Sequence, residues 1–540
     1  MRAAIRSKLR VLLMSLVSIA AISLPLAMQA PLAPVANAAT QHTSMNCVLN
    51  SRFCSEVYDS QKVFGGDQYI GHDEPSVLFY SNRPGSGNQM RYNLTLPKDP
   101  SASQPLTPGK SFNFELHPAF FFGMAMCDTQ SFPEQVSTCT PDSDTNIVDP
   151  AVSAAHPGTA FMEMQFYPPG WVSWPAGNSC APTQWCAALN IDSLSQNPVS
   201  GQSLNATCQG IAGLEYVNFA FITKNGKPQP NSPPNPVNST LTTFTPNRAA
   251  DLFMNSGDNI VVTMHDTQHG LQIALDDRTT GQSGSMTTSA ANGFGQVKFA
   301  PDPSTECTNI PYDFHPMYST SSEATRVPWA AHSYNIAFSD ETGHFDACTN
   351  VDTTNGTCIG NEGSGSDQEP ADGDDNGCHA ASESLLVKIA GCSGTNTGFD
   401  GTPYQNVWPD GNTKLHPTPI TFTSPLTGYD YDTNYSRIAF EADLPRIEGT
   451  CNRSTGAGCT LIPITDDGTP AAFYPFFNAA QRGDDCSWME GNHIPGTRDF
   501  GRNAQYGSLL PLVYTNTGGT SITRFNDFRQ VISHNPCAND

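Results

Sequence analysis

Short runs in which apolar and polar residues alternate recur along the whole sequence, and they constrain the fold more than any other feature. In SFNFELH (111–117), Phe112, Phe114 and Leu116 share one face and polar residues take the other. The run NIVVTMH-DTQHG-LQIA (259–274) has the pattern of two strands joined by a turn. Alternation with a period of two indicates half-buried β-strands.

Further strands are predicted at 160–167, 215–223, 331–338, 385–389 and 437–443. Gly, Pro, Asn, Asp and Ser separate these runs, as turns between short strands require. The pattern predicts a mainly β protein with antiparallel β-sandwich or jelly-roll domains and long disulfide-pinned loops.

The length of 540 residues indicates about two domains. We expect a first β-sandwich domain at 39–300 and a second β-rich domain at 301–540. The Pro-rich segment 226–236 is expected to be a surface loop within the first.

The amino terminus has the composition of a secretory signal peptide. Arg2, Arg6, Lys8 and Arg10 precede an apolar run at 11–28, and Ala36-Asn37-Ala38 follows it. A basic start, an apolar stretch and an A-x-A site predict removal of residues 1–38. An uncleaved membrane anchor is the alternative, which the prolines within and after the run disfavour. We expect a secreted, extracellular protein without membrane association after processing.

All 16 cysteines follow this segment, several as close neighbours such as Cys180 and Cys186. An even number in an exported chain predicts disulfides, whose pairing the sequence leaves open. Zinc is disfavoured because C-x-x-C pairs are absent from the sequence. A formal net charge of −24 makes the chain a poor nucleic-acid binder. Its oligomeric state stays open.

An acidic loop at 366–384 contains the spacing D-x-D-x-N-G-x5-E, which resembles EF-hand-type calcium loops over these twelve residues. The expected ligands are Asp372, Asp374, Asn376 and Glu383. Their oxygen atoms at alternate positions suit one hard cation, so we expect a structural calcium ion. A solvated acidic loop without metal is the alternative.

The strand at 160–167 (AFMEMQFY) carries an unusual polar face, with Glu163, Gln165 and Tyr167 at alternate positions and Trp171 and Trp174 beyond them. Aromatic rings stack on the apolar faces of sugars, while carboxylates and amides bind hydroxyl groups or transfer protons. This combination predicts a sugar-binding groove with Glu163 as a catalytic candidate and the other four residues as substrate contacts. Polar residues on the solvent face of an ordinary sandwich strand are the alternative.

The strand at 437–443 (RIAFEAD) brings a second pair of carboxylates to one face. Glu441 and Asp443 are about 7 Å apart along the strand. The order E-x-D resembles the opening of the catalytic strand in laminarinase-like glycoside hydrolases, which implies catalytic roles for both. The match departs from that family at Pro445, which ends the alternation, and Glu448 comes late.

Three phrases, QFYPPGW (165–171), FEADLPRIE (440–448) and IPGTRDFG (494–501), resemble segments of a family of large secreted proteins from soil actinobacteria and fungi. The resemblance implies secretion and a shared architecture, and it transfers no catalytic residue.

These features favour a secreted carbohydrate-active protein, in particular a glycoside hydrolase that uses strand carboxylates on an extracellular polysaccharide or other glycan. A non-catalytic, calcium-stabilised carbohydrate-binding or adhesion protein is the first alternative. An acid-acting peptidase with a Glu/Gln pair on a β-sandwich is the second.

Overall fold

The structure is a computed structural model. It describes residues 76–98, 111–114, 119–131, 160–170, 180–194, 205–212, 215–298, 307–317, 321, 336–340, 345–348, 351–352, 357–358, 361–362, 369–370, 418–442, 477–482, 485–491, 494–500, 510–515, 521–526, 528–532 and 535–537. Within these residues the protein is mainly β, and its strand pairs are antiparallel, which confirms the predicted fold class.

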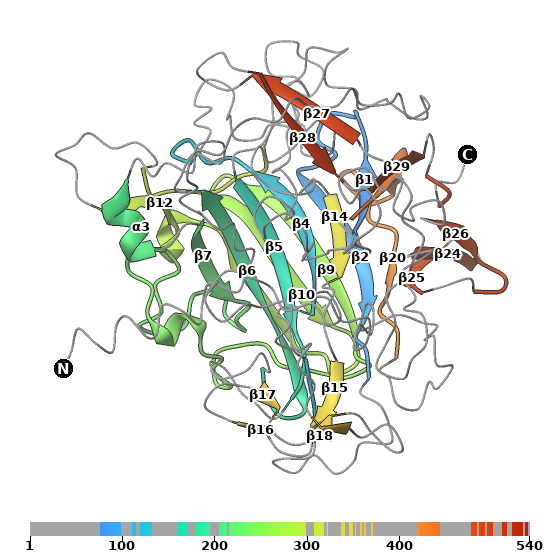
Figure 1. Cartoon of the computed structure of the whole chain (residues 1–540), viewed down its shortest axis with the longest axis horizontal. Coiled ribbons are helices and arrows are strands. Elements are labelled where there is room, and N and C mark those ends of the chain that lie inside the picture. Colours follow the sequence, from blue (N-terminus) through green and yellow to red (C-terminus); the bar gives the residue numbers. More distant parts are fainter. Residues whose placement is uncertain are drawn as a thin grey trace.

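The first of two large sheets, sheet A, has nine strands (Figure 1). In spatial order they are β29 (Phe528–Ile532), β23 (Arg437–Ala442), β1 (Ser76–Tyr80), β14 (Ile336–Asp340), β4 (Phe120–Met126), β5 (Ala160–Tyr167), β6 (Gln184–Leu194) and β7 (Glu215–Phe221), with β8 (Met254–Asn255) paired to β6.

The second large sheet, sheet B, has ten strands. Their order is β11 (Ser283–Thr287), β10 (Gly270–Asp277), β9 (Asn259–Thr267), β2 (Gln89–Thr95), β20 (Thr421–Thr423), β25 (Asp485–Glu490), β24 (Phe477–Arg482) and β26 (Arg498–Phe500). The short β21 (Leu426–Thr427) pairs with β2 and with β22 (Thr433–Asn434).

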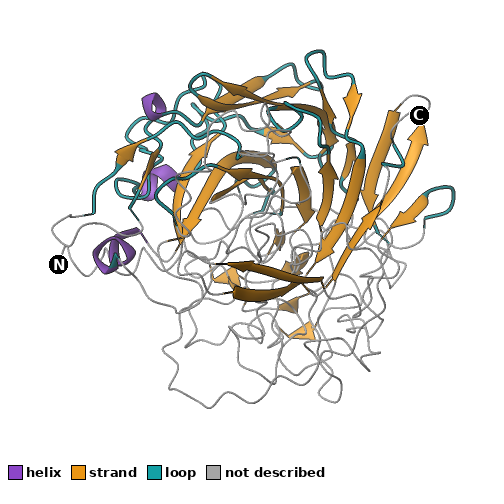
Figure 2. Ribbon diagram, turned by 90° about the horizontal axis from the view of Figure 1, so that it is seen from above, coloured by secondary structure: helices purple, strands orange, loops and turns teal. Residues whose placement is uncertain are grey.

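The two sheets pack face to face around one hydrophobic core (Figure 2). Rings from sheet A meet rings from sheet B directly. The centroids of Phe122 and Tyr92 are 4.0 Å apart, and those of Phe338 and Phe422 are 4.4 Å apart. The alternate residues that the sequence pattern assigns to one strand face thus form the interior of a β-sandwich.

Both sheets take strands from either side of residue 300. In sheet A, β14 lies between β1 and β4, and in sheet B, β20 pairs with β2. The predicted boundary between 39–300 and 301–540 therefore runs through both sheets and not between them.

Smaller elements surround the sandwich. They are the helix α3 (Ala206–Ala212), the 3-10 turns η3 (Leu241–Phe244) and η4 (Ala290–Asn292), the pair β12 (Gly295–Gln296) and β13 (Ile310–Pro311), the group β3 (Ser111–Phe114), β15 (Phe345–Cys348), β18 (Asn361–Glu362) and β19 (Glu369–Pro370), the pair β16 (Val351–Asp352) and β17 (Thr357–Cys358), and the hairpin β27 (Leu510–Thr515) and β28 (Ser521–Asn526). Among the described segments, every helix is too short or too polar to cross a membrane.

Three disulfides join described residues: Cys180–Cys186, Cys208–Cys307 and Cys486–Cys537. The first closes a loop of close neighbours, and the second connects α3 to a segment beyond residue 300. Disulfides persist in oxidising compartments, so they indicate an extracellular type of environment.

Candidate functional site

The central strand β5 is buried on both sides. Met162, Met164 and Phe166 point into the sandwich core. The alternate residues, among them Glu163 and Gln165, lie on the opposite side of sheet A, which we call the outer face. Glu163 and Gln165 are both 0% exposed.

Three polar side chains form a row along β5 on the outer face. Gln165 Nε2 donates a hydrogen bond of 2.6 Å to Glu163 Oε2, and the Tyr167 hydroxyl donates to Gln165 Oε1. The predicted site residues Glu163, Gln165 and Tyr167 are thus in contact with one another. The carboxamide of Gln165 links the carboxylate to the phenol.

A second row on β6 supplies a carboxylate that sequence reasoning missed. Asn190 is the direct cross-strand partner of Glu163, and Asp192 is that of Phe161. Asn190 Nδ2 donates a hydrogen bond of 2.6 Å to Asp192 Oδ2. Glu163 and Asp192 are therefore diagonal neighbours, with Cβ atoms roughly 7 Å apart. The signal was present in the alternation Asn190-Ile191-Asp192.

Gly and Ala residues occupy three register positions next to Glu163 and Gln165 on the outer face, whereas the β4 partner of Gln165 is the bulky Phe121. Gly123 on β4 is the other cross-strand partner of Glu163, Ala337 on β14 follows Gly123, and Ala188 faces Gln165. The core side of the same strands carries bulky residues such as Phe122 and Phe338. A glycine inside a strand marks a place where a ligand or another backbone approaches closely.

Aromatic side chains border this region on the β7 side. Phe219 is the cross-strand partner of Asn190, and its ring lies 5.0 Å from that of Phe244 in η3. Tyr167 and Phe221 belong to the same cluster, which also contains the Cys180–Cys186 disulfide. Phe219, Phe221 and Phe244 thus form an apolar wall beside the polar rows.

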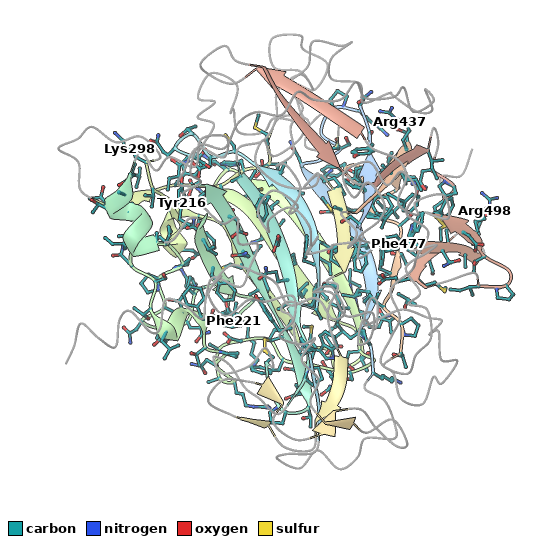
Figure 3. All side chains as sticks on the ribbon, viewed as in Figure 1. Tyr216, Phe221, Lys298, Arg437, Phe477 and Arg498 are labelled. Carbon is teal, nitrogen blue, oxygen red and sulfur yellow. A yellow bond between two sulfur atoms is a disulfide. The ribbon has the colours of Figure 1, made fainter. Side chains whose placement is uncertain are left out.

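The other predicted catalytic strand lies far from Glu163. Glu441 on β23 pairs with Ser76 and Arg529, and β1, β14 and β4 separate β23 from β5. Four strand spacings correspond to about 19 Å. Figure 3 labels Phe221 on β7 and Arg437 on β23, two strands that lie toward opposite edges of sheet A. Asp443 lies outside the described residues.

Several other predicted site residues also lie outside the described part of the chain. They are Trp171 and Trp174 and the expected calcium ligands Asp372, Asp374, Asn376 and Glu383. Within the described residues, no group of three or more His, Cys, Asp or Glu side chains forms a metal-binding cluster.

Two buried carboxylates elsewhere in the sandwich have protein partners. Asp128, after β4, accepts hydrogen bonds from Ser193 Oγ (2.6 Å) and Gln296 Nε2 (2.8 Å), and burial raises its pKa to about 6 against the opposing effect of its hydrogen-bond donors. Asp266 Oδ1 is 2.9 Å from His315 Nδ1. The contacts of Asp128 and Asp266 thus connect segments that are distant in the sequence.

The sequence matches no protein-family model and no curated protein.

Proposed function

We propose that the protein is a secreted carbohydrate-active hydrolase that cleaves glycosidic bonds of an extracellular polysaccharide at the outer face of sheet A. The observation that carries this proposal is the diagonal pair Glu163 and Asp192 on neighbouring strands, beside Gly123. Glycoside hydrolases need two carboxyl groups about 5–9.5 Å apart on either side of the scissile bond. Side chains that start from Cβ atoms roughly 7 Å apart reach that range.

The chemistry requires one carboxyl group to protonate the leaving oxygen and the other to act as nucleophile or base. Gln165 and Asn190 each hold one of the two carboxylates by a hydrogen bond of 2.6 Å, which restricts their rotation. Phe219 and Tyr167 are buried and pack beside the two polar rows. Trp171 and Trp174 are proposed to stack on the sugar rings of the substrate.

A panel of polysaccharides tests the proposal. Glu163→Gln and Asp192→Asn should each lower product release at least about 1,000-fold, and the melting temperature should change little because both substitutions preserve shape. Asp276→Asn is the matched control, since Asp276 is a half-exposed carboxylate on β10. Unchanged product release in both site variants contradicts the proposal. Binding without any product release by the wild type indicates instead a carbohydrate-binding or adhesion protein.

The contact between Glu163 and Gln165 favours a second candidate, an acid-acting peptidase in which a carboxyl and a carboxamide together activate water. This reading predicts cleavage of a denatured protein substrate at acidic pH. Both Glu163→Gln and Gln165→Glu should abolish that cleavage, whereas Asp192→Asn should spare it.

We also propose that Asp372, Asp374, Asn376 and Glu383 bind a structural calcium ion. The spacing of these oxygen donors supports the proposal. Removal of calcium by a chelator should lower the melting temperature, and re-addition of calcium should restore it. A melting temperature that is insensitive to the chelator argues against a stabilising ion.

A further inference from the structure

The segment between β7 and β8 builds the apolar wall beside the polar rows. It contains the Pro-rich stretch 226–236 and η3, whose Phe244 packs on Phe219. The end of this segment returns to sheet A, where Leu252 N donates to Ile222 O and Thr223 forms a bridge with Asp251. A contact that holds this segment in place therefore also holds the apolar wall in place.

Gln229 and Asp251 join the Pro-rich stretch to the returning end of the segment. Gln229 Nε2 donates to Asp251 Oδ2 at 3.0 Å and to Thr245 O at 3.1 Å, so both amide hydrogens are used. Asp251 Oδ2 also accepts the backbone N–H of Asn247 at 2.6 Å. The carbonyl acceptor at Thr245 defines which end of the Gln229 side chain is the nitrogen.

The two remaining oxygen atoms of this contact have no hydrogen-bond partner within the described structure. Gln229 Oε1 and Asp251 Oδ1 are both buried. A buried acceptor without a hydrogen-bond donor destabilises the folded state. Gln229 Nε2 already donates to Asp251 Oδ2, and a proton on Asp251 Oδ1 would allow the carboxylic acid and the carboxamide to form a ring with two hydrogen bonds.

We infer that Asp251 is protonated on Oδ1 and donates to Gln229 Oε1, forming a proton-dependent clip that fastens the wall beside the candidate site. The wall includes Phe244 and, through it, Phe219. This inference goes beyond the proposed hydrolase and holds whatever the substrate is.

The charges around the clip are consistent with a proton as the bound species. Burial raises the pKa of Asp251 to about 7, while the Asn247 N–H and the positive charge of Lys224 act in the opposite direction. Lys224 is exposed and donates to Arg248 O, and the Arg248 guanidinium lies over Phe253 and donates to Gln184. The positive charge of Lys224 disfavours a metal cation at the same oxygens.

The direction of the pH effect follows from linkage. The pKa of the clipped carboxyl, about 7, is above the 3.8 of a free one, so closing the clip takes up a proton. The clip is therefore at full strength below about pH 4. Between pH 4 and about 7, the equilibrium constant for its closing falls about tenfold per pH unit. Above that pH no further loss is expected.

Hydrogen exchange followed by mass spectrometry tests the clip in the whole protein between pH 4 and 8. After correction for intrinsic rates, peptides covering 224–251 should exchange about tenfold faster per pH unit up to about pH 7 and then level off. Asp251→Asn should give slow, pH-independent exchange, because the Asn amide donates to Gln229 Oε1 without titrating.

Asp276→Asn is the matched control and should behave like the wild type. Exchange of 224–251 that does not change with pH in the wild type, or that changes equally in Asp251→Asn, overturns the clip. Neither readout involves a substrate, so failure of the clip and failure of the proposed hydrolase are separate results.

Discussion

Asp128 is a buried carboxyl group whose surroundings set its charge. Burial raises its pKa from 3.8 to about 6, and hydrogen bonds from Ser193, Gln130, Ser131 and Tyr216 reduce that rise. The folded protein therefore holds a proton at Asp128 over a pH range where the unfolded chain has lost it. The resulting stabilisation is full below about pH 4 and is lost as the pH rises through 6.

Substitution of Asp128 by Asn tests this linkage. Between pH 4 and 7, the wild type should lose about 3 kcal/mol of unfolding free energy relative to Asp128→Asn, which does not titrate. Urea denaturation of both proteins at several pH values measures the difference. Parallel curves would show that Asp128 has the same pKa in the folded and unfolded chain.

At the residue scale, the sequence predicted the row of Glu163, Gln165 and Tyr167 because alternation alone puts them on one strand face. It did not predict that this face is buried, since a local pattern does not tell what packs against it. Asp192 was missed for a related reason. Its position beside Glu163 depends on the register between β5 and β6, and that register is not encoded within either strand.

At the scale of elements, Gly270 shows how one residue permits the β9–β10 hairpin. It has a φ of +100°, and a Cβ there would lie 2.8 Å from Thr288 O and 3.0 Å from Phe314 O. Gly270→Ala should lower the unfolding free energy by about 2–4 kcal/mol, from backbone strain together with the clash.

Gly281 provides the matched control for this prediction. Its φ is +74°, but a Cβ there meets no atom within 4 Å. Gly281→Ala should cost about 1 kcal/mol, from backbone strain alone. Thermal unfolding of both variants measures the contrast, and equal losses would mean that the contacts around Gly270 contribute nothing.

The elements themselves were predictable where alternation was strict. The predicted strand 160–167 coincides with β5. The predicted hairpin 259–274 covers β9 and the first part of β10, which continues to Asp277, and the described residues of the predicted strand 437–443 form β23. Of the predicted strands 331–338 and 111–117, the structure describes 336–338 and 111–114, which lie in β14 and β3. The predicted strand 385–389 lies outside the described residues. Strand ends depend on partner strands, which short local patterns do not specify.

At the scale of the whole molecule, the order of strands in the sheets was beyond the reach of the sequence pattern. Length and composition indicated two domains, and the segment near 301–305 has the composition of a linker. In the structure, however, Phe338 and Phe422 from the second half pack against Phe122 from the first. The Cys208–Cys307 disulfide also crosses the predicted boundary. Antiparallel strands pair across any sequence distance, so a linker-like composition does not by itself separate two cores.

The interleaved sheets predict that the two halves do not fold separately. A fragment of residues 39–300 lacks β14, so β1 has no strand to join it to β4, and Phe122 loses the rings of Phe338 and Phe422. Loss of so much buried aromatic surface exceeds the marginal stability of a domain. The fragments 39–300 and 301–540, each expressed alone, should therefore lack cooperative thermal unfolding, whereas the intact chain should unfold its sandwich in a single calorimetric transition. Cooperative unfolding of either fragment by itself would instead support a domain boundary near residue 300.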